Sequence, residues 1–322
     1  MGPIPKSPQV QLSQRRRSRE KAPEPIMNAN ASRNGVNPNG TETSLLNRVS
    51  HSSHFSSTAK SRFLAALRYG PVKTARELLK EIPIVAKTRD NRGYTPLHYA
   101  AMATLCDTAE MVKELRQAGA NIDAEDISGN TPLHYSCPKM AAALIDMNAN
   151  IEARNLQGST ALHLAANKGL TEKVRILLTA NANVEAQDNW QLNTPLHSAA
   201  RAGYLEIVKM VLGKGANVNS VNKLGMTPLC LVASSFTLKP GLDKVVQLLL
   251  NANADMKIPD KDGNTPLHHA AMNENLEILR LLLNEGGDIH LANRKGVTVW
   301  DLAQRPGRRE IKKVISQIIV KV

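Results

Sequence analysis

The sequence predicts an all-α repeat solenoid of about eight helix-turn-helix units, preceded by a disordered basic arm, and three observations lead to this prediction. A four-residue motif of the type Thr-Pro-Leu-His recurs at intervals of 29 to 38 residues. Only three Phe, five Tyr and two Trp occur in 322 residues, which indicates thin layers of aliphatic side chains rather than one thick core. The first 60 residues are rich in Pro, Ser and Asn, and their few hydrophobic side chains cannot offset the entropy lost on folding.

The arm, residues 1–60, and the array, residues 61–322, differ in charge. The chain carries a net charge of +13, but residues 61–304 hold 26 Lys/Arg against 24 Asp/Glu. Residues 1–60 hold nine against three, and residues 305–322 hold six against one. An electrostatic function is therefore expected at the two ends, with nucleic acid, an acidic membrane surface or an acidic protein as candidate partners.

The sharpest feature of the arm is the run Arg15-Arg16-Arg17-Ser18-Arg19. Such a run suits an import receptor, an acidic surface, or a basophilic kinase acting on Ser18. A phosphate there would add about −1.5 to −2 charge and cancel much of the cluster. The alternative interpretation is a solubilising charge run on a flexible tail.

Each position of the recurring motif has a physical reason. The Thr hydroxyl can cap the coming helix, and Pro fits the first helical turn because its missing N–H costs nothing there. The Leu begins an apolar stripe that continues through an Ala pair, and such small side chains let neighbouring helices approach closely. The motif occurs at Thr95–His98, Thr131–His134, Thr160–His163, Thr194–His197, Thr227–Cys230, Thr265–His268 and, in degenerate form, Thr298–Asp301.

A second, amphipathic helix follows each motif, as in Glu172–Leu178 and Leu205–Leu212, with apolar residues at i, i+3, i+4 and i+7. These helices should stop at residues that tolerate the left-handed conformation of a helix C-cap. The predicted stops are Gly119, Asn148, Asn181, Gly215, Asn251 and Gly286.

The motif and its period of about 33 residues resemble the ankyrin repeat family over about residues 61–320. The resemblance implies an ankyrin-like stack of helix pairs with β-hairpin fingers projecting from it. It also implies a concave face, made of finger tips and first-helix side chains, on which partners bind. The array then divides into an N-terminal capping unit (61–89), six repeats (90–297) and a C-terminal capping unit (298–322).

The histidines of the motif lie a whole repeat apart, so they predict hydrogen bonds between neighbouring turns rather than a metal site or acid–base chemistry. They are His98, His134, His163, His197 and His268. The chain contains no Gly-rich phosphate loop, no His-Glu-x-x-His and no Gly-x-Ser-x-Gly. We therefore predict no catalytic residue, no metal ligand and no cofactor, and we expect the protein not to be an enzyme.

Four repeats depart from the regular pattern, and function can be encoded in such departures. Extra residues lengthen the loops at Ala103–Thr108 and Ser234–Gly241. Cys137-Pro138 should shorten the first helix of its repeat. The finger Asn189–Asn193 has one extra residue and no glycine.

The finger tips carry apolar residues that packing does not require, in a run over four successive fingers. If it lay at an interface, a Trp there could cost about 2 kcal/mol or more on truncation. The alternative is that single exposed apolar side chains are ordinary. With residues expected on the facing helices, the predicted partner-binding set is Tyr94, Tyr99, Ile127, Tyr135, Leu156, Trp190, Leu192, Arg201 and Leu224.

These features predict a monomeric, non-catalytic interaction scaffold that binds a protein partner on the concave face. The alternatives are a nuclear or nucleic-acid-associated regulator that uses the Arg-rich arm, and a bacterial effector that acts in a host cell. Nucleic acid would then contact the arm and not the array. No run reaches the ~18 apolar residues of a membrane-spanning helix. The expected location is the cytoplasm, the nucleus or both, and the host cytosol for an effector.

Overall fold

The computed structural model describes residues 53–103, 109–235 and 241–319. The predictions for Arg15, Arg16, Arg17, Ser18 and Arg19 lie outside the described residues. The first helix, α1 (Ser53–Tyr69), extends across the boundary that the sequence predicts between residues 60 and 61.

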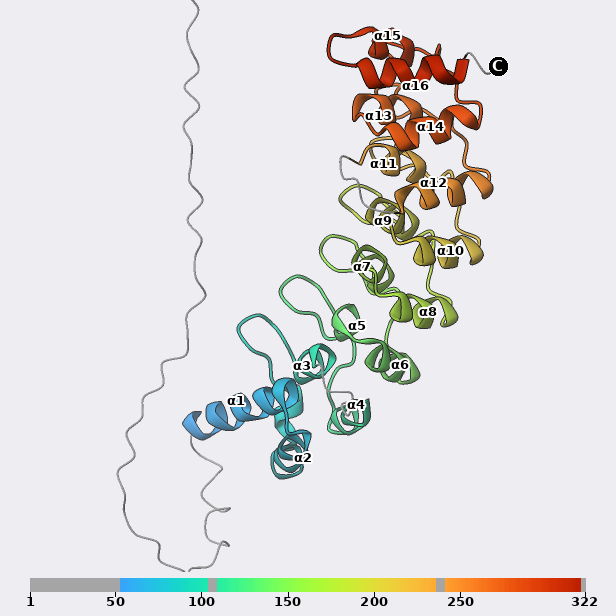
Figure 1. The fold of residues 1–322 in the computed structure, drawn as a ribbon. Coiled ribbons are helices and arrows are strands. Elements are labelled where there is room, and N and C mark those ends of the chain that lie inside the picture. Colours follow the sequence, from blue (N-terminus) through green and yellow to red (C-terminus); the bar gives the residue numbers. More distant parts are fainter. Residues whose placement is uncertain (1–52, 104–108, 236–240, 320–322) are drawn as a thin grey trace, which may run out of the picture. The chain divides into compact units, whose positions relative to one another are not determined.

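Within residues 52–322 the helices form eight consecutive pairs in the described part of the chain (Figure 1). The first pair is α1 and α2 (Val72–Glu81), and a 3₁₀ turn, η3 (Pro83–Lys87), follows it. The remaining helices are α3 (Pro96–Met102), α4 (Ala109–Gln117), α5 (Pro132–Tyr135), α6 (Pro138–Asp146), α7 (Ala161–Lys168), α8 (Thr171–Thr179), α9 (Pro195–Ala202), α10 (Leu205–Gly213), α11 (Pro228–Ala233), α12 (Leu242–Asn251), α13 (Pro266–Met272), α14 (Leu276–Asn284), α15 (Val299–Gln304) and α16 (Arg309–Ile319).

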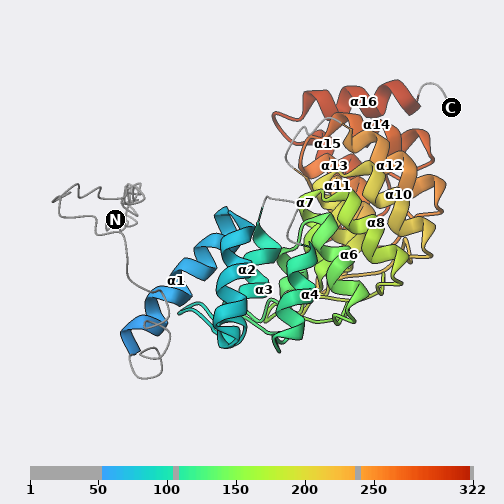
Figure 2. The same cartoon turned by 90° about the horizontal axis from the view of Figure 1, so that it is seen from below.

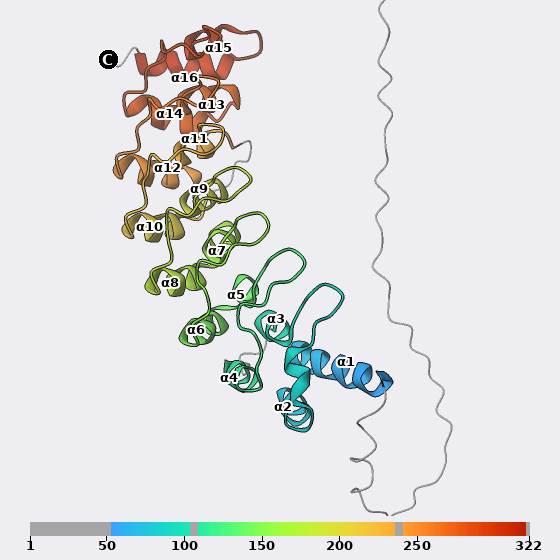
Figure 3. The same cartoon turned by 180° about the vertical axis from the view of Figure 1, so that it is seen from behind.

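The pairs stack in two rows, as the solenoid prediction requires. Odd-numbered helices pack on odd-numbered ones, such as α7 on α9 and α9 on α11, and even-numbered helices such as α12 and α14 do the same. Loops project from the odd row, which we call the inner row (Figures 1 and 3). Figure 2 shows the same order of pairs from below.

Small aliphatic side chains fill the layer between the rows. The predicted Ala pairs are fully buried, and the motif leucines lie beside them. At roughly 25 cal/mol per Å² of apolar surface, many thin layers of this kind together supply the free energy that aromatic side chains give to thicker cores. The buried pairs are Ala100 and Ala101, Ala165 and Ala166, Ala199 and Ala200, and Ala270 and Ala271.

The motif histidines make the predicted structural hydrogen bonds. In α3, the backbone N–H and the hydroxyl of Thr95 donate to His98 Nδ1 at 3.1 and 2.9 Å. The ring then donates from Nε2 to the carbonyl oxygen of Asn130 in the next repeat, at 2.9 Å. The other four histidines repeat both contacts. Each ring therefore caps its own helix and ties its repeat to the next.

The fingers are tight turns that precede the inner helices. In each one the first residue donates its N–H to the carbonyl of the last residue, at 2.9 to 3.1 Å. Within the described residues they contain no regular strand, and one isolated bridge joins Ala292 to Thr298. The seven fingers are Asp90–Tyr94, Asp126–Asn130, Asn155–Ser159, Asp188–Asn193, Asn222–Met226, Asp260–Asn264 and Asn293–Val297, which we number 1 to 7.

Backbone hydrogen bonds join each finger to the one before it. Ile127 N–H donates to Arg92 O at 3.0 Å, and Leu156 N–H donates to Ser128 O at 2.9 Å. The same bond recurs between all later fingers. The tips therefore form one continuous edge, whose spacing is fixed by the main chain rather than by side chains.

The stops of the even-numbered helices, which we call the outer helices, match the sequence prediction at five of six positions. Gly119, Gly215 and Gly286 have φ between 84° and 87°, and Asn148 and Asn181 have φ of 62° and 60°. The prediction of Asn251 was wrong. That residue is the last of α12, and Asn253 takes the left-handed conformation at φ 64°. Both positions are Asn, so residue type alone did not separate them.

Close contact between fingers makes one glycine position especially sensitive. Gly158 has φ 73°, and a Cβ there would lie 2.5 Å from Asn189 N in the next finger. We expect Gly158→Ala to cost about 3 kcal/mol, from the left-handed backbone and the collision together. The control is Gly215→Ala, which has φ 84° but open space around it, and which should cost about 1 kcal/mol. Urea unfolding of the two variants measures the difference, and equal losses would contradict the close contact.

The shortest inner helix is completed by a lysine from another repeat. As predicted, Cys137-Pro138 ends α5 early, after four residues. Lys173 of α8 is fully buried, and its Nζ donates to Leu133 O at 2.8 Å and to His134 O at 3.1 Å. These carbonyls have lost the helical turn that would otherwise satisfy them. Burial lowers the pKa of the Lys173 amine to about 7.

Candidate protein-binding face

The tips of the fingers and the exposed side of the inner helices form one surface, which we call the finger face. Each predicted apolar tip residue is solvent-exposed, with fractions between 39% and 74%. Leu156 and Ile127 lie in consecutive fingers, whose backbones are hydrogen-bonded to each other. The exposed set is Ile127, Leu156, Trp190, Leu192 and Leu224.

Finger 4 presents Trp190 because it contains one residue more than its neighbours. Asn189 N–H donates to the preceding finger (Gln157 O, 2.8 Å), and Gln191 O accepts from the following one (Lys223 N, 2.6 Å). In the regular finger 3, these two bonds involve adjacent residues, Leu156 and Gln157. Trp190 is therefore the inserted residue, and it is 68% exposed.

The insertion also changes the backbone at the end of the turn. Six fingers place glycine with φ between 72° and 83° at this point, whereas finger 4 places Leu192 at φ 56°. A leucine in the left-handed region costs about 1 to 2 kcal/mol. Such strain tends to be retained where the local shape serves a function, so finger 4 is a candidate functional element.

Two hollows flank Trp190. One, of about 390 Å³, lies between fingers 3 and 4 and helices α7 and α9, and it contains Arg201, Asp188 and Ser198 in its wall. The other, of about 470 Å³, lies over fingers 4 to 6 and contains Leu224 and two lysines. The structure thus brings Trp190, Arg201 and Leu224 to one region of the finger face.

The three predicted tyrosines gather at the N-terminal end of the face. The Tyr94 ring lies edge-on to those of Tyr99 and Tyr135, with centroids 6.0 and 5.7 Å apart. Tyr99 Oη donates to Asp90 Oδ2 at 2.8 Å, and Tyr135 Oη donates to Asp126 Oδ2 at 2.6 Å. Burial and the neighbouring carboxylate raise the pKa of Tyr99 to about 12 and also raise that of Tyr135. Their hydroxyl groups already have partners, so half-buried rings are what they offer to another molecule.

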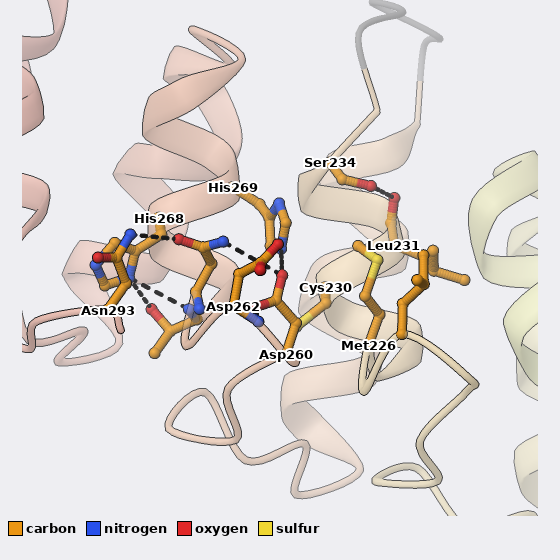
Figure 4. Close-up of polar contacts among 12 residues, drawn as sticks. Met226, Cys230, Leu231, Ser234, Asp260, Asp262, His268, His269 and Asn293 are labelled. Carbon is orange, nitrogen blue, oxygen red and sulfur yellow. Dashed lines mark hydrogen bonds and ion pairs between the residues drawn. The ribbon is translucent and has the colours of Figure 1, made fainter. Parts of the chain in front are cut away.

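The contact between finger aspartate and inner helix recurs near the C-terminal end with a different ring. His269 of α13 lies with Nε2 2.8 Å from Asp260 Oδ2, and both side chains are largely buried (Figure 4). The aspartate and ring of this contact were not singled out from the sequence, nor were Asp188 and Ser198. Their positions in the repeat could have identified them. Each aspartate begins a finger, and each partner residue directly follows the motif histidine.

The described residues contain no group of three or more His, Cys, Asp or Glu side chains that could hold a metal ion. In the same part of the chain, no helix has both the length and the apolar character that crossing a bilayer requires.

Comparisons with known proteins agree with this architecture. A family model described as ankyrin repeats (3 copies) matches residues 63–155, 138–222, 214–293 and 232–318. The B-cell lymphoma 3 protein homolog of Mus musculus is 35% identical over 212 residues, which is 63% of this chain and 38% of that protein. NF-kappa-B inhibitor alpha of Gallus gallus is 43% identical over 49 residues, which is 15% of this chain and 14% of that protein.

A solved structure resembles the stack as well. The crystal structure of the ankyrin repeat domain of Bcl-3, described as a unique member of the IkappaB protein family, matches with a TM-score of 0.60 and 27% identity. The match covers 70% of this chain and 100% of that one. The chain spans well under two thirds of the length of the curated relatives that it matches.

Proposed function

Because the chain belongs to the ankyrin repeat family, we propose that it is a non-catalytic adaptor that holds a protein partner on its finger face. The observation that supports this most is Trp190. An inserted residue carries a large apolar side chain into solvent at the middle of a run of exposed aliphatic tips. Aromatic residues surrounded by such a rim are typical of the centres of protein interfaces.

The proposal predicts that Trp190→Ala combined with Leu156→Ala abolishes partner capture and leaves thermal unfolding near that of the wild type. Both side chains are mostly exposed, so their removal costs little folding energy. Loss of an interface centre should weaken binding by about 2 kcal/mol or more. The measurement is affinity capture from cell extract with the full chain as bait, followed by thermal unfolding of both proteins.

The matched control removes one exposed aromatic and one exposed aliphatic side chain outside the fingers. Tyr69 at the end of α1 is 73% exposed, and Ile84 in η3 is 65% exposed. The variant Tyr69→Ala/Ile84→Ala should capture the same proteins as the wild type. Unchanged capture by the Trp190→Ala/Leu156→Ala variant would show that these tips are not the interface.

A second candidate function is regulation of an NF-kappa-B protein. The similarity to Bcl-3, in sequence and in structure, and to NF-kappa-B inhibitor alpha favours this candidate over an unspecified partner. Purified NF-kappa-B, added in the same capture assay, distinguishes the two. Binding that is lost in the Trp190→Ala/Leu156→Ala variant would support the second candidate, and absence of binding would exclude it.

A further inference from the structure

Fingers 2, 4 and 6 share one design. Each begins with an aspartate and ends with an asparagine, and one carboxylate oxygen, Oδ1, accepts N–H groups from its own finger. Oδ2 of each aspartate remains free to bind something else. The pairs are Asp126 and Asn130, Asp188 and Asn193, and Asp260 and Asn264.

In fingers 2 and 6 an aromatic side chain contacts Oδ2 through a hydrogen bond. The ring belongs to the residue directly after the motif histidine: Tyr135 donates at 2.6 Å, and His269 lies at 2.8 Å. The asparagine that ends each finger adds a longer contact of 3.4 Å. Tyr99 makes the same contact to the aspartate of finger 1 at 2.8 Å. The geometry of this position is therefore suited to a ring that donates a hydrogen bond.

In finger 4 the corresponding residue is Ser198, whose side chain is too short to make this contact. None of the residues that the structure describes donates a hydrogen bond to Asp188 Oδ2. The hollow of about 390 Å³ lies at this point, lined by both residues and by Trp190. Gln191, in the same wall, has its Oε1 buried without a hydrogen-bond partner among the described residues. The hollow thus occupies the place that Tyr135 fills in finger 2.

The charges around the hollow select among hydrogen-bond donors. Arg201 also lines it, and its exposed guanidinium would repel a lysine or arginine side chain that approached Asp188. A neutral donor avoids this repulsion, and a phenol is the donor that two of the three equivalent aspartates already bind.

We propose that this hollow binds a tyrosine side chain of a protein partner, with the phenol donating to Asp188 Oδ2 and the ring packing against Trp190. The inference rests on the proposed function, because it names the residue type with which a partner would anchor itself. It differs from that proposal in placing the anchor between the fingers and not on the tips.

Filling the hollow from within the chain is the first test. Ser198→Tyr should restore the contact that Tyr135 makes to Asp126, and it should raise the unfolding midpoint by about 2 to 4 °C. It should also prevent the hollow from binding a tyrosine side chain of a partner. Ser198→Ala is the control: it keeps the hollow open and should change neither property. A lower midpoint in the Ser198→Tyr variant, with binding retained, would overturn the proposal.

Direct binding of a small probe is the second test. N-acetyl-tyrosinamide is titrated into the ¹⁵N-labelled full chain, and the indole N–H signal of Trp190 is followed by NMR. Trp300 in α15 is the second of the two tryptophans and provides an internal control that should not shift. N-acetyl-phenylalaninamide lacks the phenol hydroxyl and should bind about tenfold more weakly. Equal shifts from both probes, or a larger shift from N-acetyl-lysinamide, would overturn the proposal.

Asp188→Asn tests the role of the carboxylate in binding while the backbone hydrogen bonds of the finger are kept. Asn155 stands at the same position in finger 3 and accepts the same pair of backbone amides, both at 3.0 Å. The variant should therefore fold normally but bind N-acetyl-tyrosinamide about tenfold more weakly. Because the probe assay needs no partner, its failure bears on this inference alone, whereas failure of the capture assay bears on the proposed function.

Discussion

Acidification from pH 7 to pH 4 is expected to remove about 3 kcal/mol of stability for each of His134 and His197. Burial lowers the pKa of both rings to about 4 in the folded chain, against an ordinary value of 6.5. The unfolded chain therefore takes up protons first as the pH falls. The stabilising contribution of each ring is fully present above pH 6.5 and is lost as the pH approaches 4.

The other three motif histidines act in the same direction, because burial lowers their pKa values as well. Two carboxylates with lowered pKa values titrate in a separate window. The pKa values of Asp90 and Asp126 are lowered, since hydrogen bonds from tyrosine and backbone N–H groups outweigh their burial. Their contribution is therefore lost only as the pH falls below their ordinary value of 3.8. Loss between pH 6.5 and 4 thus reports on the histidines rather than on Asp90 and Asp126.

Urea unfolding followed by circular dichroism at half-unit pH steps measures this loss. The control is His197→Cys, because Cys230 occupies the same position in its own repeat and is fully buried there. In this variant the loss of stability between pH 7 and pH 4 should be smaller by the contribution of one histidine ring. A stability that stays constant between pH 7 and pH 4 would show that the rings are not held neutral by burial.

Between pH 7 and pH 9 the stability should rise by about 2 kcal/mol because of Lys173. Its pKa is about 7 in the folded chain and 10.5 ordinarily, so folding releases a proton in this range. The stabilising contribution is fully present above pH 10.5 and is lost as the pH falls towards 7. At neutral pH, the amine that completes α5 therefore carries a cost of desolvation.

Lys173→Met should remove the rise between pH 7 and pH 9. The position lies eight residues before the left-handed residue that ends the outer helix, and α4 and α6 place the buried Met111 and Met140 there. Methionine therefore fits, although Leu133 O and His134 O lose a donor. The comparison must stop at pH 9, because burial raises the pKa of Cys230 above its ordinary 9 and opposes the effect from there on. An undiminished rise in the variant would assign the titration to another group.

The repeated parts of the fold could be predicted from the sequence because each is local. Thr-Pro-Leu-His specifies a helix start within four residues, and its histidine reaches only to the next turn. Likewise, Pro138 disfavours a helical conformation at Cys137, and α5 is therefore short. Lys173 was not predicted, because an amphipathic pattern tolerates one lysine. Its role depends on the early end of α5, about 40 residues before it in the chain. That end leaves two carbonyl groups, Leu133 O and His134 O, for the lysine to bind.

The exposed residues of the candidate site could be predicted from the sequence, whereas the hollow between the fingers could not. The exposure of Trp190 and Leu156 follows from their places in turns. The sequence predicts Tyr99 and Tyr135 on this face, but it does not show that their hydroxyl groups bind aspartates nine residues earlier in the chain. The hollow beside Asp188 arises because Ser198 leaves that contact unmade. A gap of this kind appears only when equivalent positions in several repeats are compared in space.

The side-chain hydrogen bonds between fingers recur at every second interface, whereas the backbone hydrogen bonds recur at every interface. Asn155 Nδ2 donates to Asn130 Oδ1 at 2.9 Å, and the bond recurs between fingers 4 and 5 at 3.1 Å and between fingers 6 and 7 at 2.8 Å. Fingers 4 and 6 begin with aspartate, whose side chain has no N–H to donate backwards. The amide side chains therefore couple the fingers two by two. An array of this type would lengthen most readily by duplication of a pair, because copying a single repeat would leave one asparagine without its counterpart.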